Sequence, residues 1–177
     1  MPIPFELADR IFQAEKRLLK PLKWKAVVSP KGNEQRRLLE CRVAVDGGVL
    51  RGVFFRIRVL PGSLARAVFQ LECDLPASRV HVPLYRLEVQ PLRGHTNRLY
   101  GPNEINGRLF SPGETHEHVF YDSLKKDRTL RSNACEQARR VEVEIKNFST
   151  GLRFACDRIK ITNAEDVPPP GDQGILL

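Results

Sequence analysis

Residues 37–60 read RLLECRVAVDGGVLRGVFFRIRVL, and this stretch decides the fold. Apolar and polar residues alternate on both sides of its centre, with the period of two that is typical of a strand with one buried face. The centre, Asp46-Gly47-Gly48, is a tight hairpin signal. The stretch therefore predicts two antiparallel strands with one apolar face and one face rich in arginine.

The same alternation continues on either side of this hairpin. It marks residues 22–28, 66–73, 80–89, 116–121 and 141–145, most of them bounded by proline and glycine clusters. Apolar residues at helical spacing predict an N-terminal helix over residues 4–20 and a final helix over residues 147–158. We therefore expect an α+β fold, an antiparallel meander of about six strands with both helices packed on one face.

Length and composition set the limits of this prediction. The 177 residues are 41% hydrophobic and 28% charged, which suits one globular domain over residues 1–163, followed by a proline-rich tail over 164–177 that does not pack. No apolar run approaches the roughly 20 residues of a membrane span. The first 25 residues lack the apolar core of a signal peptide, so we expect a cytoplasmic protein with no membrane partner.

Positive charge is concentrated near the N-terminus. The chain carries a formal net charge of +8, with most of the excess in residues 1–60. A basic surface is typical of proteins that bind polyanions, and here it predicts RNA or an acidic protein partner such as an antitoxin. A solvated surface that only maintains solubility is the alternative. The candidate nucleic-acid contacts are Arg10, Lys16, Arg17, Lys20, Lys23 and Lys25.

The four cysteines are scattered along the chain. Cys41, Cys73, Cys135 and Cys156 form no Cys-x-x-Cys pair and have no histidine beside them in the sequence. Structural zinc sites usually show closely spaced ligand pairs, so we expect four buried thiols without a disulfide. Phosphate-binding loops, dinucleotide fingerprints and nucleophile elbows are also missing from the sequence, and no cofactor is expected.

A loop of about 20 residues over 91–114 connects two predicted strands, and loops of this length usually carry function. His95 and Asn97 lie in the loop, and His116-Glu117-His118 follows it. Residues i and i+2 of a strand share a face, so the imidazoles of His116 and His118 should point the same way. If the flanking strands are neighbours, His95 joins them.

Three roles are open to such a histidine cluster. The first is metal-independent cleavage of an RNA phosphodiester, with His95, His116 and His118 as acid and base and Arg86 or Arg98 stabilising the developing charge. The second is a transition-metal site with the same three histidines as ligands. The third is structural, with imidazoles that bond loop carbonyls and hold the loop in place.

The order of these motifs resembles an uncharacterised prokaryotic family of small proteins of toxin–antitoxin or mobile-element type. The resemblance spans about residues 55–160 and rests on Leu84-Tyr85-Arg86, His95-Thr96-Asn97, His116-Glu117-His118 and the ending Leu152-Arg153-Phe154-Ala155-Cys156. The family pattern continues His-x-His-x-Tyr, whereas here Val119 and Phe120 separate His118 from Tyr121 and place Tyr121 on the other face.

Together these features favour a bacterial or phage protein of toxin or defence type that acts on RNA through its basic N-terminal third and its histidines. A non-enzymatic module that binds nucleic acid or protein, with structural histidines, is the alternative from a different class. A metal-binding protein that uses the same histidines is the third.

Overall fold

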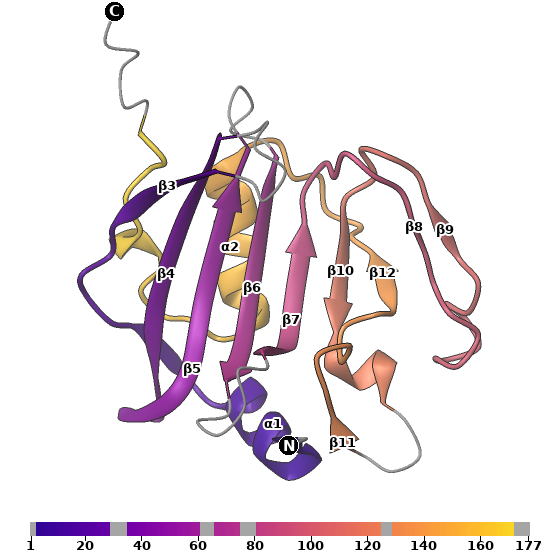
Figure 1. The fold of residues 1–177 in the computed structure, drawn as a ribbon, viewed down its shortest axis with the longest axis horizontal. Helices are drawn as coiled ribbons and strands as arrows, with labels where there is room; N and C mark the ends of the chain where they lie inside the picture. The colour runs from indigo at the N-terminus through magenta and orange to yellow at the C-terminus, as the bar shows by residue number, and fades with distance from the viewer. Residues whose placement is uncertain (1–2, 29–34, 61–65, 75–80, 125–128, 172–177) are drawn as a thin grey trace, which may run out of the picture.

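An antiparallel sheet forms the centre of the computed structural model, which describes residues 3–28, 35–60, 66–74, 81–124 and 129–171 (Figure 1). Among these residues the sheet has eight strands in the order β12-β10-β7-β6-β5-β4-β2, with β3 also paired to β4. The strands are β2 (Lys16–Leu18), β3 (Trp24–Val28), β4 (Gln35–Val45), β5 (Gly48–Val59), β6 (Ala67–Asp74), β7 (His81–Glu88), β10 (His116–Val119) and β12 (Ala138–Arg140). The predicted α+β class and antiparallel sheet are confirmed, with a larger sheet than expected.

The remaining elements are short, apart from two helices. The helices are α1 (Phe5–Gln13) and α2 (Phe148–Arg158), and the 3-10 turns are η1 (Phe120–Ser123) and η2 (Ala164–Asp166). Two small antiparallel pairs complete the fold: β1 (Ile3–Pro4) with β11 (Thr129–Leu130), and β8 (His95–Thr96) with β9 (Leu109–Phe110). The β8–β9 pair folds the predicted long loop back on itself.

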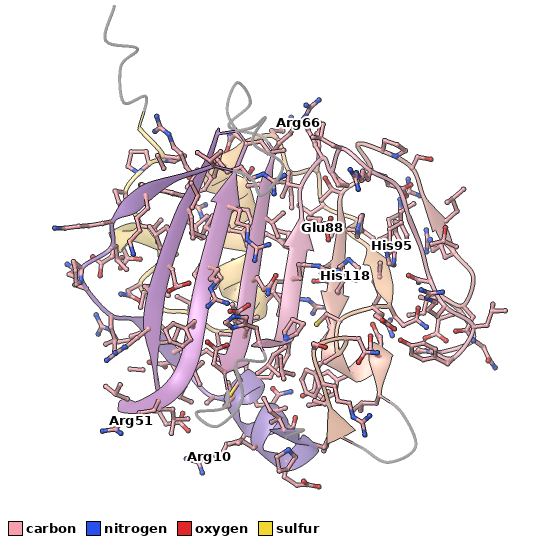
Figure 2. All side chains as sticks on the ribbon, in the orientation of Figure 1. Arg10, Arg51, Arg66, Glu88, His95 and His118 are labelled. Atoms are coloured by element: carbon pink, nitrogen blue, oxygen red, sulfur yellow. The ribbon has the colours of Figure 1, made fainter. Side chains whose placement is uncertain are left out.

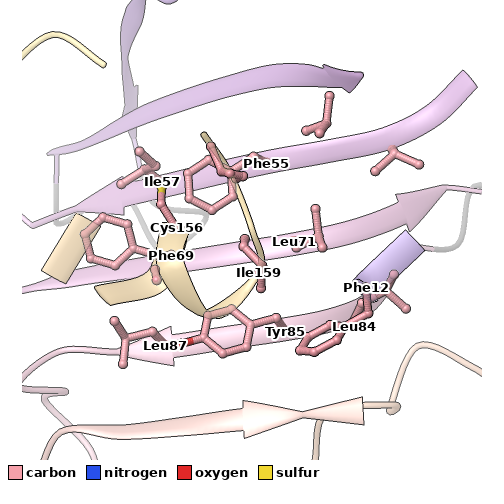
Figure 3. Close-up of a cluster of buried hydrophobic side chains, with 14 of the residues drawn as sticks. Phe12, Phe55, Ile57, Phe69, Leu71, Leu84, Tyr85, Leu87, Cys156 and Ile159 are labelled. Atoms are coloured by element: carbon pink, nitrogen blue, oxygen red, sulfur yellow. The ribbon is translucent and has the colours of Figure 1, made fainter. Parts of the chain in front are cut away.

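The β4–β5 hairpin forms as the sequence predicts. Asp46 and Gly47 both have positive φ, 48° and 74°, the backbone of a tight turn that matches the twist of the flanking strands. Cys41 lies opposite Phe55, and both enter the core together with Leu39, Val43, Val53, Ile57 and Val59, which share their parity. Figure 3 shows Phe55, Ile57, Phe69 and Leu71 packed with residues of α2. The four predicted core cysteines are confirmed as buried and free.

Helix α2 covers one face of the sheet, behind β5 and β6 in the view of Figure 1. Its N-terminus carries a capping box between Asn147 and Thr150, which satisfies two helix-end donors. Gly151 stands where the helix meets Phe69, since a Cβ atom there would lie 3.0 Å from the Phe69 ring. Close packing on the sheet therefore explains a glycine inside the predicted helix.

An ion pair between a buried carboxylate and a half-exposed arginine joins β10 to α2. Glu117 is only 5% exposed, and Arg158 of α2 donates to both of its carboxylate oxygens, at 2.8 Å from Nη2 and 3.1 Å from Nε. The Tyr85 hydroxyl donates to the same carboxylate at 3.1 Å. Because Glu117 faces α2, the histidines on either side of it in β10 must point to the opposite face of the sheet.

The predicted helix over residues 4–20 is wrong in its second half. Helix α1 ends at Gln13, and the following chain extends into β2, where Arg17 pairs with Ala44 of β4. Residues 16–18 have a helical pattern, but their backbone pairs with β4 at the edge of the sheet instead. Helix α1 lies below the lower end of the sheet in Figure 1 rather than across its face. The ring centroids of Phe12 and of Phe120 in η1 are 5.6 Å apart.

Lys16 is fully buried at this junction, although the sequence pattern placed it on a solvent-exposed helix face. Its ammonium donates to the carbonyls of Phe12, Ala14 and Ile159 at 2.9, 2.7 and 2.8 Å. These carbonyls lie at the C-terminal ends of α1 and α2, where a cation is favoured by the helix dipole. Burial, and then the positive charge of the nearby Lys160, lower the pKa of Lys16 to about 8.

Two other local predictions are also wrong. Residues 141–145 form no strand: β12 ends at Arg140, and Val143 is exposed. The tail was expected not to pack from residue 164 onward, yet η2 forms, Val167 is buried, and the Trp24 indole donates to the Pro168 carbonyl at 2.9 Å. Residues 172–177 lie outside the described part of the chain.

Replacing Lys16 with Met should lower the free energy of unfolding by about 3 kcal/mol, because three buried carbonyls lose their donor. Urea unfolding at pH 7 measures this change. Lys20→Met is the matched control, since Lys20 is exposed and, among the described residues, forms only a surface ion pair with Asp166. It should alter stability by less than about 0.5 kcal/mol. Equal effects of the two substitutions would contradict the role given to Lys16.

Candidate functional site

The face of the sheet opposite α2 carries polar and charged side chains from neighbouring strands. Phe69 packs against Phe148 of α2, so its neighbour Gln70 points to the opposite face, which we call the open face. Cross-strand pairing places Arg56, Gln70, Arg86 and His118 in one row across β5, β6, β7 and β10. This row joins the arginine-rich strands to the histidine motif.

Strand register assigns further charged residues to the open face, which is turned toward the viewer in Figure 2. Its basic side chains within β2–β7 are those of Arg17, Lys25, Arg36, Arg42, Arg56, Arg58 and Arg86. Its acidic side chains in the same strands are those of Glu40, Glu72, Asp74 and Glu88. Positive charge therefore exceeds negative charge across this face.

Arg58 is a guanidinium of this face that has no partner among the described residues. It forms no hydrogen bond or ion pair with any described residue, and it is exposed to solvent. Partial burial and then the positive charges of Arg56, Arg86 and Arg36 lower its pKa. The carboxylate of Glu88 opposes this shift but forms no ion pair with Arg58. An arginine held among other arginines without a paired carboxylate is electrostatically suited to receive an anion.

Arg56 and Phe54 continue the open face along β5. Arg56 pairs with Glu40 at 2.5 Å and with the buried Glu72, so its charge is already compensated. Its guanidinium also lies 5.5 Å from the centre of the Phe54 ring, and this ring is half-buried on the same face. The open face thus combines basic groups with an aromatic ring.

The histidine cluster forms at the β10 side of this face. Strand β10 pairs with β7, and the β8–β9 pair brings His95 beside the two histidines of β10. The ring centroids of His95 and His118 are 5.0 Å apart, those of His116 and His118 are also 5.0 Å apart, and those of His95 and His116 are 5.7 Å apart. The sequence prediction that these three imidazoles meet is confirmed. Figure 2 labels His95 and His118 of this cluster.

Asn97 holds the β8–β9 segment in this position. Its side-chain amide donates to the carbonyls of Ile105 and Ala138 at 2.8 and 2.9 Å, and its carbonyl accepts from the Ala138 amide at 2.7 Å. The same carbonyl oxygen lies 3.0 Å from Nε2 of His95, which must therefore carry its proton there. The His-x-Asn motif thus joins the loop to β12 and orients one histidine.

Two of the three imidazoles are sealed from solvent. His116 and His118 are 1% and 0% exposed, and the Phe110 ring of β9 lies 4.9 Å from that of His116. His95 is half-buried. A substrate would reach His116 or His118 only after the β8–β9 segment moved. The ribonuclease hypothesis therefore stays a prediction, and this geometry does not favour it.

Hydrogen bonds define the protonation of the buried pair. Nδ1 of His116 donates to the Glu114 carbonyl at 2.8 Å, which leaves a lone pair on Nε2. Nε2 of His118 lies 3.2 Å from Nη2 of Arg86, a group that can only donate, so Nε2 of His118 is an acceptor. Burial lowers the pKa of both imidazoles, and the charge of Arg86 lowers them further.

Arg86 is the arginine that joins the cluster. Its Nε lies 2.9 Å from a carboxylate oxygen of Glu88, and its Nη2 also donates to the Cys135 carbonyl at 3.2 Å. Arg98, the other candidate, contributes its backbone: its amide and carbonyl both bond the side chain of Gln137, at 2.9 Å each. Tyr121 lies away from the cluster, where its hydroxyl contacts Asp9 and Gln13 of α1.

The predicted nucleic-acid contacts do not form one surface. Lys16 is buried, so its assignment is wrong. Arg17 and Lys25 belong to the open face, whereas Arg10 is exposed on α1, at the lower end of the molecule in Figure 2. Lys20 and Lys23 are exposed in the connection between β2 and β3. These assignments assumed one helix over residues 4–20, which the chain does not form.

Three residues of the site were missed at the sequence level: Phe54, Arg58 and Glu88. The signal that could have found Arg58 and Glu88 is parity within the strands. Each alternates with core residues, Arg58 with Ile57 and Val59 and Glu88 with Leu87 and Val89. Phe54 gave no such signal, because Val53-Phe54-Phe55 is apolar throughout.

No family model matches the chain, and neither the curated proteins nor the solved structures contain a match. The resemblance to prokaryotic toxin–antitoxin or mobile-element proteins therefore stays a prediction. Among the described residues, no helix is both long and apolar enough to cross a bilayer.

The buried histidines should make the protein less stable in acid. Both pKa values are lowered in the folded state, so the unfolded chain binds more protons once the pH falls below about 6.5. The free energy of unfolding should therefore decrease from pH 7.5 to 5.5, as urea unfolding in EDTA-containing buffer would show. His118→Asn should flatten this dependence, whereas His81→Asn should retain it; identical slopes would contradict the assignment.

Proposed function

We propose that this protein binds single-stranded nucleic acid, RNA above all, on the open face of its sheet. The observation that carries the proposal is the unpartnered guanidinium of Arg58, held among Arg36, Arg56 and Arg86 on a face that α2 does not cover. Such a surface attracts the phosphate groups of nucleic acid, because each phosphate that a basic side chain neutralises releases condensed counterions.

Two features favour a single strand over a duplex. Proteins that bind single strands combine a basic surface with aromatic rings on which bases stack, and Phe54 supplies such a ring between Arg42 and Glu72 in the cross-strand register. Sheet faces also serve as platforms for unpaired RNA bases in other folds. Arg17, Lys25 and Arg42 extend the positive surface toward β2 and β3.

The proposed function is binding rather than catalysis. His116 and His118 are sealed, so no imidazole of this pair is positioned to exchange a proton with RNA on the open face. A role in a toxin or defence system is implied only by the resemblance. An acidic protein partner is the alternative ligand for the same surface, and competition between the RNA and that protein would detect it.

Substituting Arg58 with Gln should weaken binding of a fluorescein-labelled single-stranded RNA, measured by fluorescence anisotropy. Loss of one phosphate contact should reduce the slope of log affinity against log salt by about 0.7. Phe54→Leu should cost about tenfold in affinity at constant slope, because it removes a stacking surface and no charge.

Arg153→Gln is the matched control, because it removes one exposed positive charge from α2, on the other side of the sheet. It should leave affinity and salt slope nearly unchanged. If Arg58→Gln and Arg153→Gln weaken binding equally, attraction depends only on net charge, and the proposed surface is wrong. Tighter binding of a DNA duplex than of single-stranded RNA would also contradict the proposal.

A further inference from the structure

Glu88, His116 and His118 form a group of potential ligands that nucleic-acid binding does not use. His116 lies directly opposite Glu88 in the β10–β7 pair, and His118 shares its face. The potential ligand atoms of the three residues lie within 4.8 Å of one another. Two imidazoles and a carboxylate are a common ligand set for Zn²⁺.

His116 supplies an independent indication that something binds here. Its Nε2 is buried and has no hydrogen-bond partner among the described residues, while its Nδ1 donates to the Glu114 carbonyl. Histidines that bind zinc usually have this arrangement, with one ring nitrogen bonded to a carbonyl and the other free for the metal. Without a ligand, the buried and unpaired Nε2 of His116 would only lower the free energy of unfolding.

The other two ligands are nearly in place. Nε2 of His118 is an acceptor that lies 3.7 Å from a Glu88 oxygen, and Nε2 of His116 lies 4.0 Å from the other Glu88 oxygen. Ligand atoms around tetrahedral zinc are roughly 3.3 Å apart, given bonds of about 2.0–2.1 Å. Side-chain rotations that move these atoms by less than about 1 Å would therefore close the site.

Arg86 now supplies the positive charge of this group. Its guanidinium contacts both Glu88 and His118, so a metal ion must displace it from these two residues. The Cys135 carbonyl and the neighbouring open face remain available to the displaced side chain. Arg86 would therefore act as an internal competitor that weakens metal binding.

The second group of this kind, Glu72, Asp74 and His81, lacks these features. His81 is more than half exposed, and Arg56 pairs with Glu72 and lies near Asp74. No buried imidazole nitrogen is left unpaired there. This group therefore serves as an internal control.

We propose that Glu88, His116 and His118 bind one Zn²⁺ ion, which replaces the Arg86 guanidinium between Glu88 and His118. The fourth coordination position is left to water or to a small ligand. The site adjoins the nucleic-acid surface around Arg58 and Phe54 on the same face, but its three ligands are not RNA contacts, so either proposal can fail without the other.

Isothermal titration calorimetry of the metal-free full chain with ZnCl₂ at pH 7.5 tests the site. We expect one equivalent of Zn²⁺, with affinity at least about tenfold weaker for Glu88→Gln and His116→Gln. Arg86→Gln should bind about tenfold more tightly, because the competing charge is gone. His81→Gln should bind as the original chain does.

The absorption spectrum of the Co²⁺-bound protein identifies the ligand types and detects variants that bind the metal in an unfolded state. A folded site of imidazole and carboxylate gives no thiolate-to-metal charge-transfer band, whereas an unfolded variant that captures metal through its cysteines does. Tighter binding by Arg86→Gln cannot result from a lost fold if this band is missing. Failure of both the original chain and Arg86→Gln to bind Zn²⁺ would overturn the proposal. The proposal would also be wrong if His81→Gln abolished Zn²⁺ binding, if His116→Gln left it unchanged, or if Arg86→Gln failed to strengthen it.

Discussion

Packing of α2 on one face of the sheet is the constraint on which the rest of the structure depends. Phe69 and the residues of its parity are buried against α2, and period-two alternation then turns their neighbours toward the other face. Arg58 and Arg86 lie on the open face for this reason. The surface to which we assign the function therefore consists of the residues that alternate with the core residues along the same strands.

Buried polar interactions hold the peripheral elements to this sheet. The Lys16 ammonium joins the C-terminal ends of α1 and α2, and the Glu117 carboxylate joins β10 to α2 through Arg158. On the open face, Asn97 joins the β8–β9 segment to β12. Each interaction connects segments distant in the sequence, and each satisfies groups that would be costly to bury alone. Asn97 also orients His95 within the histidine cluster.

Much of the fold could be predicted from the sequence because strong local signals agreed with it. The alternation and turn around Asp46-Gly47 predicted the β4–β5 hairpin, and helical spacing predicted α2. Strand neighbourhood and the His-x-His pattern also predicted that His95, His116 and His118 would meet. These features depend on periods and turns, which a single sequence displays directly.

The rest depended on tertiary partners that local patterns do not reveal. Residues 16–18 have a helical pattern, yet pairing with β4 and the carbonyls around Lys16 make them a buried strand. The strand expected over residues 141–145 has no neighbour to pair with among the described residues. The Phe110 ring of β9 packs on His116 and helps to bury it, and the sequence did not specify the path of the segment that carries Phe110. Exposure of a site is therefore harder to predict than its composition.

The open face carries two candidate sites, the buried histidine cluster and the exposed basic surface around Arg58. The central proposal is that the exposed surface binds single-stranded nucleic acid. Arginine side-chain NMR spectra of the ¹⁵N-labelled chain, titrated with a short single-stranded RNA, test it most directly. The Nε–H signal of Arg58 should shift in a saturable way, together with those of its neighbours on the open face, while Arg153 on α2 stays unchanged. Shifts confined to α2, or none at all at saturating RNA, would contradict the account.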